Sequence, residues 1–186
     1  MKKKNNIKIN SGFYKGSCVQ IKKNCNVRPT SSRLKNILFN FIQNEIKKSV
    51  CLDLFGGSGA LSIEAISRGA KKLILVEKNS IIIDKLKSNV NRLNIKNIVV
   101  YNMDALYYLS HTKQKFNIIF LDPPYKLNIL NKTIKIILHK NLLSNGGFIY
   151  IELNNIYFFY KKFPKISIYN IQKVGGTFFC LLQNRF

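Results

Sequence analysis

The sequence predicts an α/β fold built on a mainly parallel β-sheet with helices on both faces. Two patterns predict it. From Val50 onward, short apolar runs typical of buried strands alternate with longer segments whose apolar residues recur every three or four positions, as in helices. In addition, the glycine-rich turn Gly56-Gly57-Ser58-Gly59 follows the first apolar run, at the place where a strand passes into a helix in such folds.

The individual elements follow from the same patterns. The predicted strands are 50–55, 72–76, 97–101, 116–121, 148–153, 166–171 and 177–182. The helices expected between them are 60–66, 80–93 and 127–139. Because Gly175 and Gly176 separate the last two strands, we expect that pair to form an antiparallel edge of the sheet.

The N-terminal part has a different pattern. Residues 1–27 are basic, and Ile7-Lys8-Ile9 and Val19-Gln20-Ile21 alternate on either side of glycines, which predicts a β-hairpin. A helix is expected after Thr30 or Ser31, either of which can cap it. Its buried stripe is predicted to contain Leu34, Ile37, Leu38, Phe41 and Ile42. We therefore divide the chain into a hairpin extension, 1–27, and a main domain, 28–186.

The composition is strongly basic, with 31 Lys and Arg against 8 Asp and Glu and a net charge of +23. Such a charge fits a phosphate backbone as partner, but a genome bias toward lysine explains it equally well. No two of the four cysteines form a C-x-x-C pair, and no apolar run approaches the roughly 20 residues of a membrane span. We expect a reduced, cytoplasmic protein without a membrane segment.

Polar positions after three of the predicted strands indicate a cofactor. Asp53 precedes the glycine-rich turn, Glu77 ends the second strand, and Asp104 follows the third. The turn lacks the spacing of a dinucleotide site and the lysine of a P-loop, so the acid before it suits a ligand with an amino or cationic end. S-adenosylmethionine has both an ammonium and a sulfonium group. The expected cofactor site comprises Asp53, Phe55, Gly57, Gly59, Glu77, Lys78, Met103, Asp104 and Ala105.

Each of these positions also has a purely structural alternative. Glycine-rich turns between strand and helix occur without ligands. Glu77 stands where an acid binds ribose hydroxyls, but it could equally be a solvated acid at a strand end. Asp104 suits either an adenine amino group or the N-cap of a helix that begins at Ala105, and one side chain can serve both.

The Asp122-Pro123-Pro124-Tyr125 cluster after strand 116–121 is the most specific signal in the chain. Two prolines remove two backbone donors and leave carbonyl oxygens without local partners. Asp122 and the Pro123 carbonyl are therefore expected to accept both hydrogens of one exocyclic NH2 group, while Tyr125 stacks on the base. Such positioning turns the nitrogen lone pair toward a methyl donor. The alternative is a strand that prolines merely terminate.

Together these motifs resemble the RsmD family of class I S-adenosylmethionine-dependent methyltransferases. Further matches are Arg28-Pro29-Thr30, Leu38-Phe39-Asn40, Ser67-Arg68-Gly69-Ala70, Tyr150-Ile151-Glu152 and Lys173-Val174-Gly175-Gly176. The resemblance implies a Rossmann-like, seven-stranded sheet whose last strand is antiparallel. It also implies methylation of N2 of one guanine in 16S rRNA, on the 30S subunit or an assembly intermediate.

In that reading, Asp122, Pro123 and Tyr125 are the catalytic residues. Substrate contacts are expected at Pro124, Tyr125, Arg28, Thr30 and Lys15. The protein is expected to act as a monomer and without a metal. Two rival hypotheses remain: a methyltransferase for another amino group, such as adenine N6 or a protein glutamine, and a basic RNA-binding protein without enzymatic activity.

Overall fold

The computed structural model describes residues 6–21, 30–123, 127–153 and 166–184. Its centre is a seven-stranded sheet in the order β5-β4-β3-β6-β7-β9-β8. The strands are β3 (Val50–Asp53), β4 (Lys72–Glu77), β5 (Ile98–Asn102), β6 (Phe116–Leu121), β7 (Leu143–Leu153), β8 (Ser167–Val174) and β9 (Thr177–Gln183). Strands β3 to β7 are parallel, and β9 runs antiparallel to both β7 and β8. The expected fold class is confirmed.

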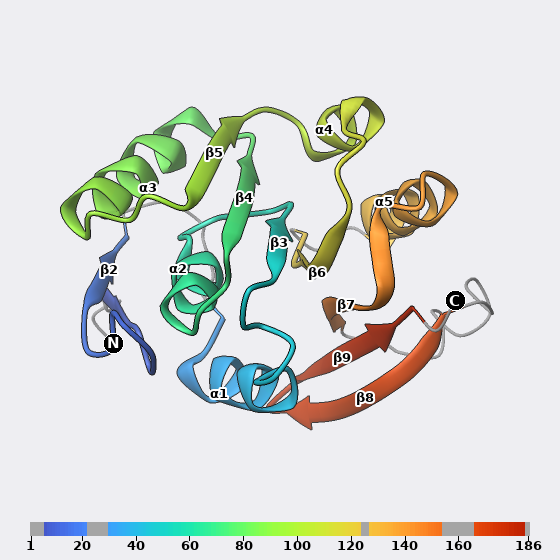
Figure 1. Cartoon of the computed structure of the whole chain (residues 1–186), viewed down its shortest axis with the longest axis horizontal. Helices are drawn as coiled ribbons and strands as arrows, with labels where there is room; N and C mark the ends of the chain where they lie inside the picture. The colour runs from blue at the N-terminus through green and yellow to red at the C-terminus, as the bar shows by residue number, and fades with distance from the viewer. Residues whose placement is uncertain (1–5, 22–29, 124–126, 154–165, 185–186) are drawn as a thin grey trace.

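Helices cover both faces of this sheet (Figure 1). They are α1 (Ser32–Phe41), α2 (Ala60–Ser67), α3 (Ser80–Arg92), α4 (Ala105–His111) and α5 (Leu127–His139). One hydrophobic cluster joins α1, α2 and α3 to the sheet through residues such as Leu38, Ile63 and Leu86. A second cluster joins α4 and α5 to the opposite face through Leu109 and Ile134. In the described part of the chain, none of the helices has the length and apolar character to cross a membrane.

Helix α1 begins where the sequence predicted. Ser31 is its N-cap, and its hydroxyl accepts a hydrogen bond from the Leu34 amide at 3.2 Å. Leu34 and Leu38 are buried as expected, but so are Phe39 and Lys35. The predicted stripe was therefore too narrow, because α1 packs against the hairpin as well as against the sheet.

Strand β7 begins at Leu143, five residues before the predicted start at Phe148. Gly146 and Gly147 lie inside the strand, at a register shift in its pairing with β6. A Cβ atom at Gly147 would come within 2.8 Å of the Asn117 carbonyl oxygen. The two glycines permit a close approach of the strands and a bulge, so the predicted strand 148–153 was too short at its start.

The hairpin consists of β1 (Asn6–Lys8) and β2 (Cys18–Gln20), which pair antiparallel in a sheet of their own. It lies beside α2 and α3, at the opposite end of the molecule from β8 and β9 (Figure 1). Its side chains Ile7, Ile9 and Val19 are buried in the same cluster as α1 and α2. The predicted boundary between 1–27 and 28–186 falls within residues 22–29, outside the described residues, and stays a prediction.

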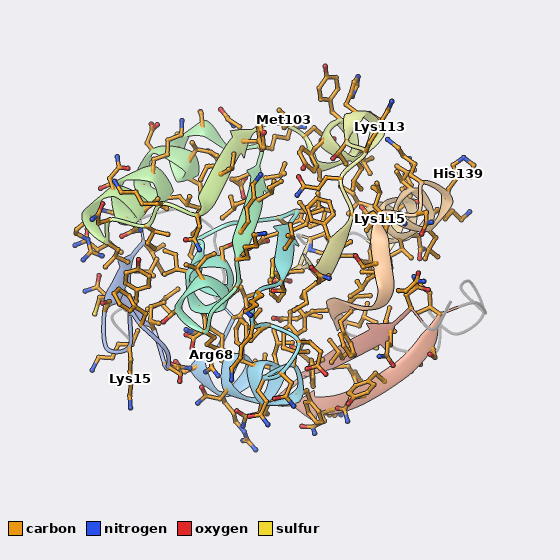
Figure 2. The ribbon with its side chains drawn as sticks, viewed as in Figure 1. Lys15, Arg68, Met103, Lys113, Lys115 and His139 are labelled. Atoms are coloured by element: carbon orange, nitrogen blue, oxygen red, sulfur yellow. The ribbon has the colours of Figure 1, made fainter. Side chains whose placement is uncertain are left out.

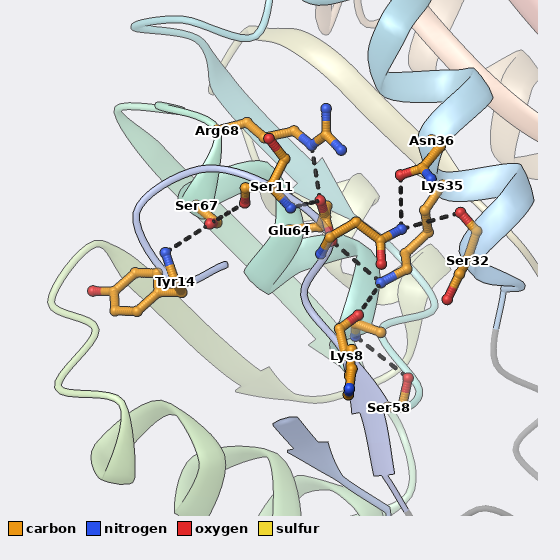
Figure 3. A network of polar contacts seen from close by, with 12 residues as sticks. Lys8, Ser11, Tyr14, Ser32, Lys35, Asn36, Ser58, Glu64, Ser67 and Arg68 are labelled. Carbon is orange, nitrogen blue, oxygen red and sulfur yellow. Dashed lines mark hydrogen bonds and ion pairs between the residues drawn. The ribbon is translucent and has the colours of Figure 1, made fainter. Parts of the chain in front are cut away.

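A polar network centred on Glu64 of α2 fastens the hairpin to the main sheet (Figure 3). The fully buried Glu64 carboxylate accepts hydrogen bonds from the Asn10 and Ser11 amides at 2.8 and 3.1 Å. It also forms ion pairs with Lys35 Nζ at 3.2 Å and with Arg68 Nε at 2.8 Å. Lys35 in turn donates to the Lys8 carbonyl at 2.8 Å. One carboxylate thus joins the hairpin, α1 and α2.

Candidate active site

The site is built at the carboxyl ends of the parallel strands, beginning with the glycine-rich turn after β3. The Gly56 amide donates to the Val76 carbonyl of β4 at 3.0 Å, and the Gly59 amide donates to the Gly56 carbonyl at 2.7 Å. A Cβ atom at Gly56 would lie 2.3 Å from Leu75 Cδ2, and Gly57 and Gly59 have φ values of 48° and 73°. Packing and left-handed backbone therefore both require glycine in this turn.

Asp53 ends β3 and lies buried beneath the turn. Its carboxylate accepts a hydrogen bond from Ser62 Oγ of α2 at 2.7 Å and another from the Phe55 amide. Burial raises the pKa of Asp53 from 3.8 to about 6, and these hydrogen bonds only partly oppose that rise. Within the described residues, no lysine or arginine forms an ion pair with Asp53. The carboxylate is thus suited to receive a cation from a ligand.

Glu77, at the end of β4, is joined to the same turn. One carboxylate oxygen accepts from the Gly57 amide at 3.0 Å, and the other accepts from the Asn79 amide at 2.8 Å. A carboxylate has about four acceptor positions, so these two bonds orient Glu77 and leave capacity for ligand hydroxyls. The ends of β3 and β4 are consequently held in one fixed arrangement.

Asp104 follows β5 and is the N-cap of α4, which is one of the two roles that the sequence predicted for it. Its Oδ1 accepts from the Leu106 and Tyr107 amides at 2.8 and 3.2 Å. Its Oδ2 lies 3.7 Å from Lys78 Nζ, an exposed pairing that adds little stability. Ala105 is buried at the start of the helix. The cap orients the Asp104 carboxylate at the carboxyl end of β5.

Two apolar candidates complete this side of the site. Phe55 and Met103 are partly buried and pack against the cluster beneath α4 and α5. Figure 2 labels Met103 beyond the end of β5. All nine residues of the expected cofactor site therefore lie at the ends of three adjacent strands, β3, β4 and β5.

Asp122 and Pro123 follow β6, the neighbour of β3 on the other side. Asp53 of β3 pairs in register with Phe120 of β6, so Asp122 lies two residues farther along the chain than the partner of Asp53. Burial and the charge of Glu152 raise the pKa of Tyr150 on β7, the strand next to β6, and the negative charge of Asp122 adds to this rise. Pro124 and Tyr125 lie outside the described residues.

The expected substrate contacts of the N-terminal part are less closely grouped. Lys15 is exposed on the hairpin and lies on the other side of the molecule from Met103 (Figure 2). Thr30 is partly buried, next to the cap of α1, and Arg28 lies outside the described residues. The structure therefore does not bring Lys15 together with the cofactor candidates.

Sequence reasoning missed several residues around the site. Ser62 had no local signal, because a serine inside an apolar helix predicts no particular partner. Tyr150 and Glu152 were noticed only as part of a family motif, although the Tyr150 hydroxyl donates to Glu152 Oε1 at 2.7 Å. The positions of Tyr150 and Glu152, two residues apart on a predicted strand, could have indicated this contact, because residues i and i+2 of a strand lie on the same face of the sheet.

Comparison with known proteins agrees with this arrangement. The family described as "Conserved hypothetical protein 95" matches residues 7–183. A ribosomal RNA small subunit methyltransferase D from Buchnera aphidicola (subsp. Baizongia pistaciae) is 43% identical over 150 residues, covering 80% of this chain and 76% of the relative. The Escherichia coli (strain K12) protein of the same name is 34% identical over 146 residues, covering 78% and 74%.

The fold comparison gives the same result. The solved structure of a putative methyltransferase from Escherichia coli superposes with a TM-score of 0.86 at 28% identity, covering 96% of this chain and 98% of that one. The matches extend over the hairpin, the glycine-rich turn and the edge strands β8 and β9. The chain therefore belongs to the RsmD family, which its motifs resemble, and is a methyltransferase.

Proposed function

We propose that this protein transfers a methyl group from S-adenosylmethionine to the exocyclic N2 amine of a guanine in 16S rRNA. The proposal includes the 30S subunit or an assembly intermediate as the substrate. The observation that carries it is the adjacency of β3 and β6, whose ends bear Asp53 with the glycine-rich turn and Asp122-Pro123, respectively. Relatives named ribosomal RNA small subunit methyltransferase D support RNA as the acceptor.

The residues at the ends of β3 to β5 fit the cofactor. Asp53 is a buried carboxylate whose pKa is raised to about 6, so a cationic ammonium beside it would stabilise its charged form. Glu77 is oriented by two backbone amides and suits ribose hydroxyls. In our proposal Asp104 and Met103 hold the adenine, the first by hydrogen bonding and the second by packing. The cofactor supplies an electrophilic methyl group on a sulfonium.

The residues after β6 act on the acceptor in this proposal. The Asp122 carboxylate and the Pro123 carbonyl accept the two N–H groups of the amine and so direct its lone pair toward the methyl group. Holding the two reacting atoms in line is the main contribution to rate, worth up to about 7–11 kcal/mol in favourable cases. The negative charge of Asp122 also stabilises the positive charge that develops on the nitrogen. Pro124 and Tyr125 complete the proposed acceptor site.

In our proposal the hairpin and the segment that follows it contact the RNA outside the target base. Lys15 is exposed and lies on the other side of the molecule from Met103 in Figure 2, which suits a contact with flanking RNA rather than with the target base. Arg28 and Thr30 are proposed to make contacts between these two regions. The hairpin is firmly placed for such a role, because Glu64 and the shared core fix its position.

The test is methyl transfer in vitro. Small ribosomal subunits from a bacterial strain that lacks the family's enzyme are incubated with the protein and tritiated S-adenosylmethionine, and the RNA is digested to nucleosides. We expect label in N2-methylguanosine, and we expect Asp122→Ala to lower the rate by at least about a hundred-fold with cofactor affinity retained. The matched control is Asp84→Ala, an exposed aspartate on α3.

Three outcomes would contradict the proposal or a part of it. Label in another nucleoside or in protein would show a methyltransferase with a different acceptor. A folded protein that binds S-adenosylmethionine but labels nothing in the subunits would exclude the proposed RNA substrate. Near-normal rates for Asp122→Ala would remove Asp122 from the role assigned to it.

A further inference from the structure

Glu152 lies on β7, directly beside the strand that bears Asp122. Leu121 of β6 pairs in register with Ile151 of β7, so the next residue on each strand, Asp122 and Glu152, follows at the same level of the sheet. The Tyr150 hydroxyl donates a hydrogen bond to Glu152 Oε1, and the charge of Asp122 helps to raise the pKa of Tyr150. The Glu152 side chain is partly exposed, as a contact with substrate requires.

Tyr150 holds Glu152 in one orientation. Its hydroxyl donates to Glu152 Oε1 at 2.7 Å, and its ring is fully buried. The ring packs between Phe120 and Phe179, with centroid distances of 6.3 and 5.7 Å. Because a buried aromatic side chain has little freedom, the hydroxyl is a fixed donor and the carboxylate is oriented before any ligand arrives.

The distribution of acids adds an independent argument. The chain carries only 8 acidic residues against 31 basic ones, yet five of the acids lie at or next to the carboxyl ends of β3 to β7. These five are Asp53, Glu77, Asp104, Asp122 and Glu152. Of the other three, Glu45 and Asp84 are exposed, and Glu64 fastens the hairpin. In the described part of the chain, no three acids, histidines or cysteines converge as metal ligands.

We infer that Glu152 selects guanine by accepting a hydrogen bond from the ring N1–H, beside the N2 amine that Asp122 holds. The inference rests on the proposed function and adds the residue that determines base specificity. Guanine presents N1–H and the N2 amine as neighbouring donors, and a pair of oriented carboxylates matches them. Adenine has a lone pair at N1, which a carboxylate repels. Tyr150 is the positioning residue that keeps Glu152 aimed at the base.

The test compares guanine with 2-aminopurine at the target position of 16S rRNA that is ligated from synthetic pieces and reconstituted into small ribosomal subunits. 2-Aminopurine keeps the 2-amino group but has an acceptor at N1. We expect wild type to prefer guanine by about a hundred-fold or more in kcat/KM, because a site built around a donor rejects an analogue that lacks it. In Glu152→Gln, the Tyr150 hydroxyl would bind the amide oxygen and direct the NH2 toward the base. The preference should then fall at least about ten-fold, mainly through a lower rate on guanine.

Two further variants make the test decisive. Tyr150→Phe removes only the hydroxyl and should reduce the preference for guanine by a smaller factor, which tests the inference even if Glu152→Gln does not fold. Glu45→Gln, an exposed glutamate elsewhere, should leave the preference unchanged. A purely structural role would lower the rates on both bases equally. An unchanged preference in both Glu152→Gln and Tyr150→Phe overturns the inference while the proposed function stands. Failure of wild type to methylate guanine in any RNA or subunit overturns the proposed function itself.

Discussion

Asp53 shows how a single residue connects stability with binding. It is buried at the end of β3, and burial raises its pKa to about 6. The Ser62 hydroxyl and the Phe55 amide orient it, but no cation within the described residues pairs with it. Such a group costs stability in the free protein and gains a partner when a cationic ligand binds.

The change Asp53→Asn tests this cost. A carboxyl whose pKa rises from 3.8 to about 6 on folding destabilises the native state above pH 6, by about 3 kcal/mol at most. The penalty decreases as the pH falls from 6 to 3.8, because the native carboxyl becomes protonated first. We therefore expect Asp53→Asn to raise the free energy of unfolding in urea at pH 8, to change it little near pH 3.5, and to weaken cofactor binding.

The matched control for that measurement is Asp84→Asn, whose side chain is exposed on α3. It should leave the free energy of unfolding nearly unchanged at both pH values. If Asp53→Asn destabilised the protein equally at pH 8 and pH 3.5, the effect would come from lost hydrogen-bond geometry at Ser62 and not from a buried charge.

At the scale of elements, the hairpin depends on Glu64. This carboxylate receives four donors, from Asn10, Ser11, Lys35 and Arg68. Burial lowers the pKa of Lys35, and the negative charge of Glu64 opposes that shift. The Glu64 carboxylate therefore offsets part of the cost of burying the Lys35 ammonium. The hairpin's apolar residues enter the main core at the same place. The element is thus held by both polar and apolar contacts.

Removing one partner of this buried pair should be costly. We expect Glu64→Gln to lower the free energy of unfolding by about 3–5 kcal/mol, because it leaves the Lys35 ammonium buried without a counter-charge. The hairpin amides, including that of Ile9, should exchange hydrogen faster than amides of β3. The double variant Lys35→Met with Glu64→Gln should recover part of the loss. If the double variant were as unstable as the sum of both single variants, Lys35 and Glu64 would not be coupled.

At the scale of the whole molecule, the charge of +23 bears on substrate binding. Five of the eight acids lie at or next to the carboxyl edge of the sheet and one lies under the hairpin, so only Glu45 and Asp84 are exposed acids away from these two places. An excess of basic charge attracts a polyanion over long distances and accelerates encounter. In our proposal the charge sets the affinity for RNA, and the acidic edge of the sheet binds the cofactor and the target base.

The salt dependence of RNA binding tests whether the basic charge sets the affinity for RNA. Each phosphate contact contributes a slope of about −0.7 to −0.9 in a plot of log affinity against log salt concentration. For six or more contacts we expect RNA affinity, measured by filter binding, to fall on the order of 10³-fold between 50 and 200 mM salt. Affinity for S-adenosylmethionine, measured by calorimetry, is the internal control and should change by less than about three-fold. A flat RNA curve would mean that the lysines reflect composition and not binding.

The sequence by itself determined the fold class, the places of the seven strands apart from the start of β7, and the acids at or just after the ends of β3, β4, β5 and β6. These features are local: the helical periodicity of Leu34 to Ile42 and the continuous apolar run that begins at Val50 are present in the chain before it folds. The turn at Gly56 could be predicted for the same reason, because its glycines allow a conformation that other residues disfavour.

Only the tertiary structure decided which distant side chains meet. Lys35 and Glu64 are 29 residues apart, and nothing local distinguishes this buried lysine from a solvated one. Glu152 comes beside Asp122 only because β7 pairs with β6 in a particular register, and the start of β7 with its bulge was not predicted. Such contacts depend on long-range pairing and on burial, which are properties of the assembled sheet and not of any segment of the chain.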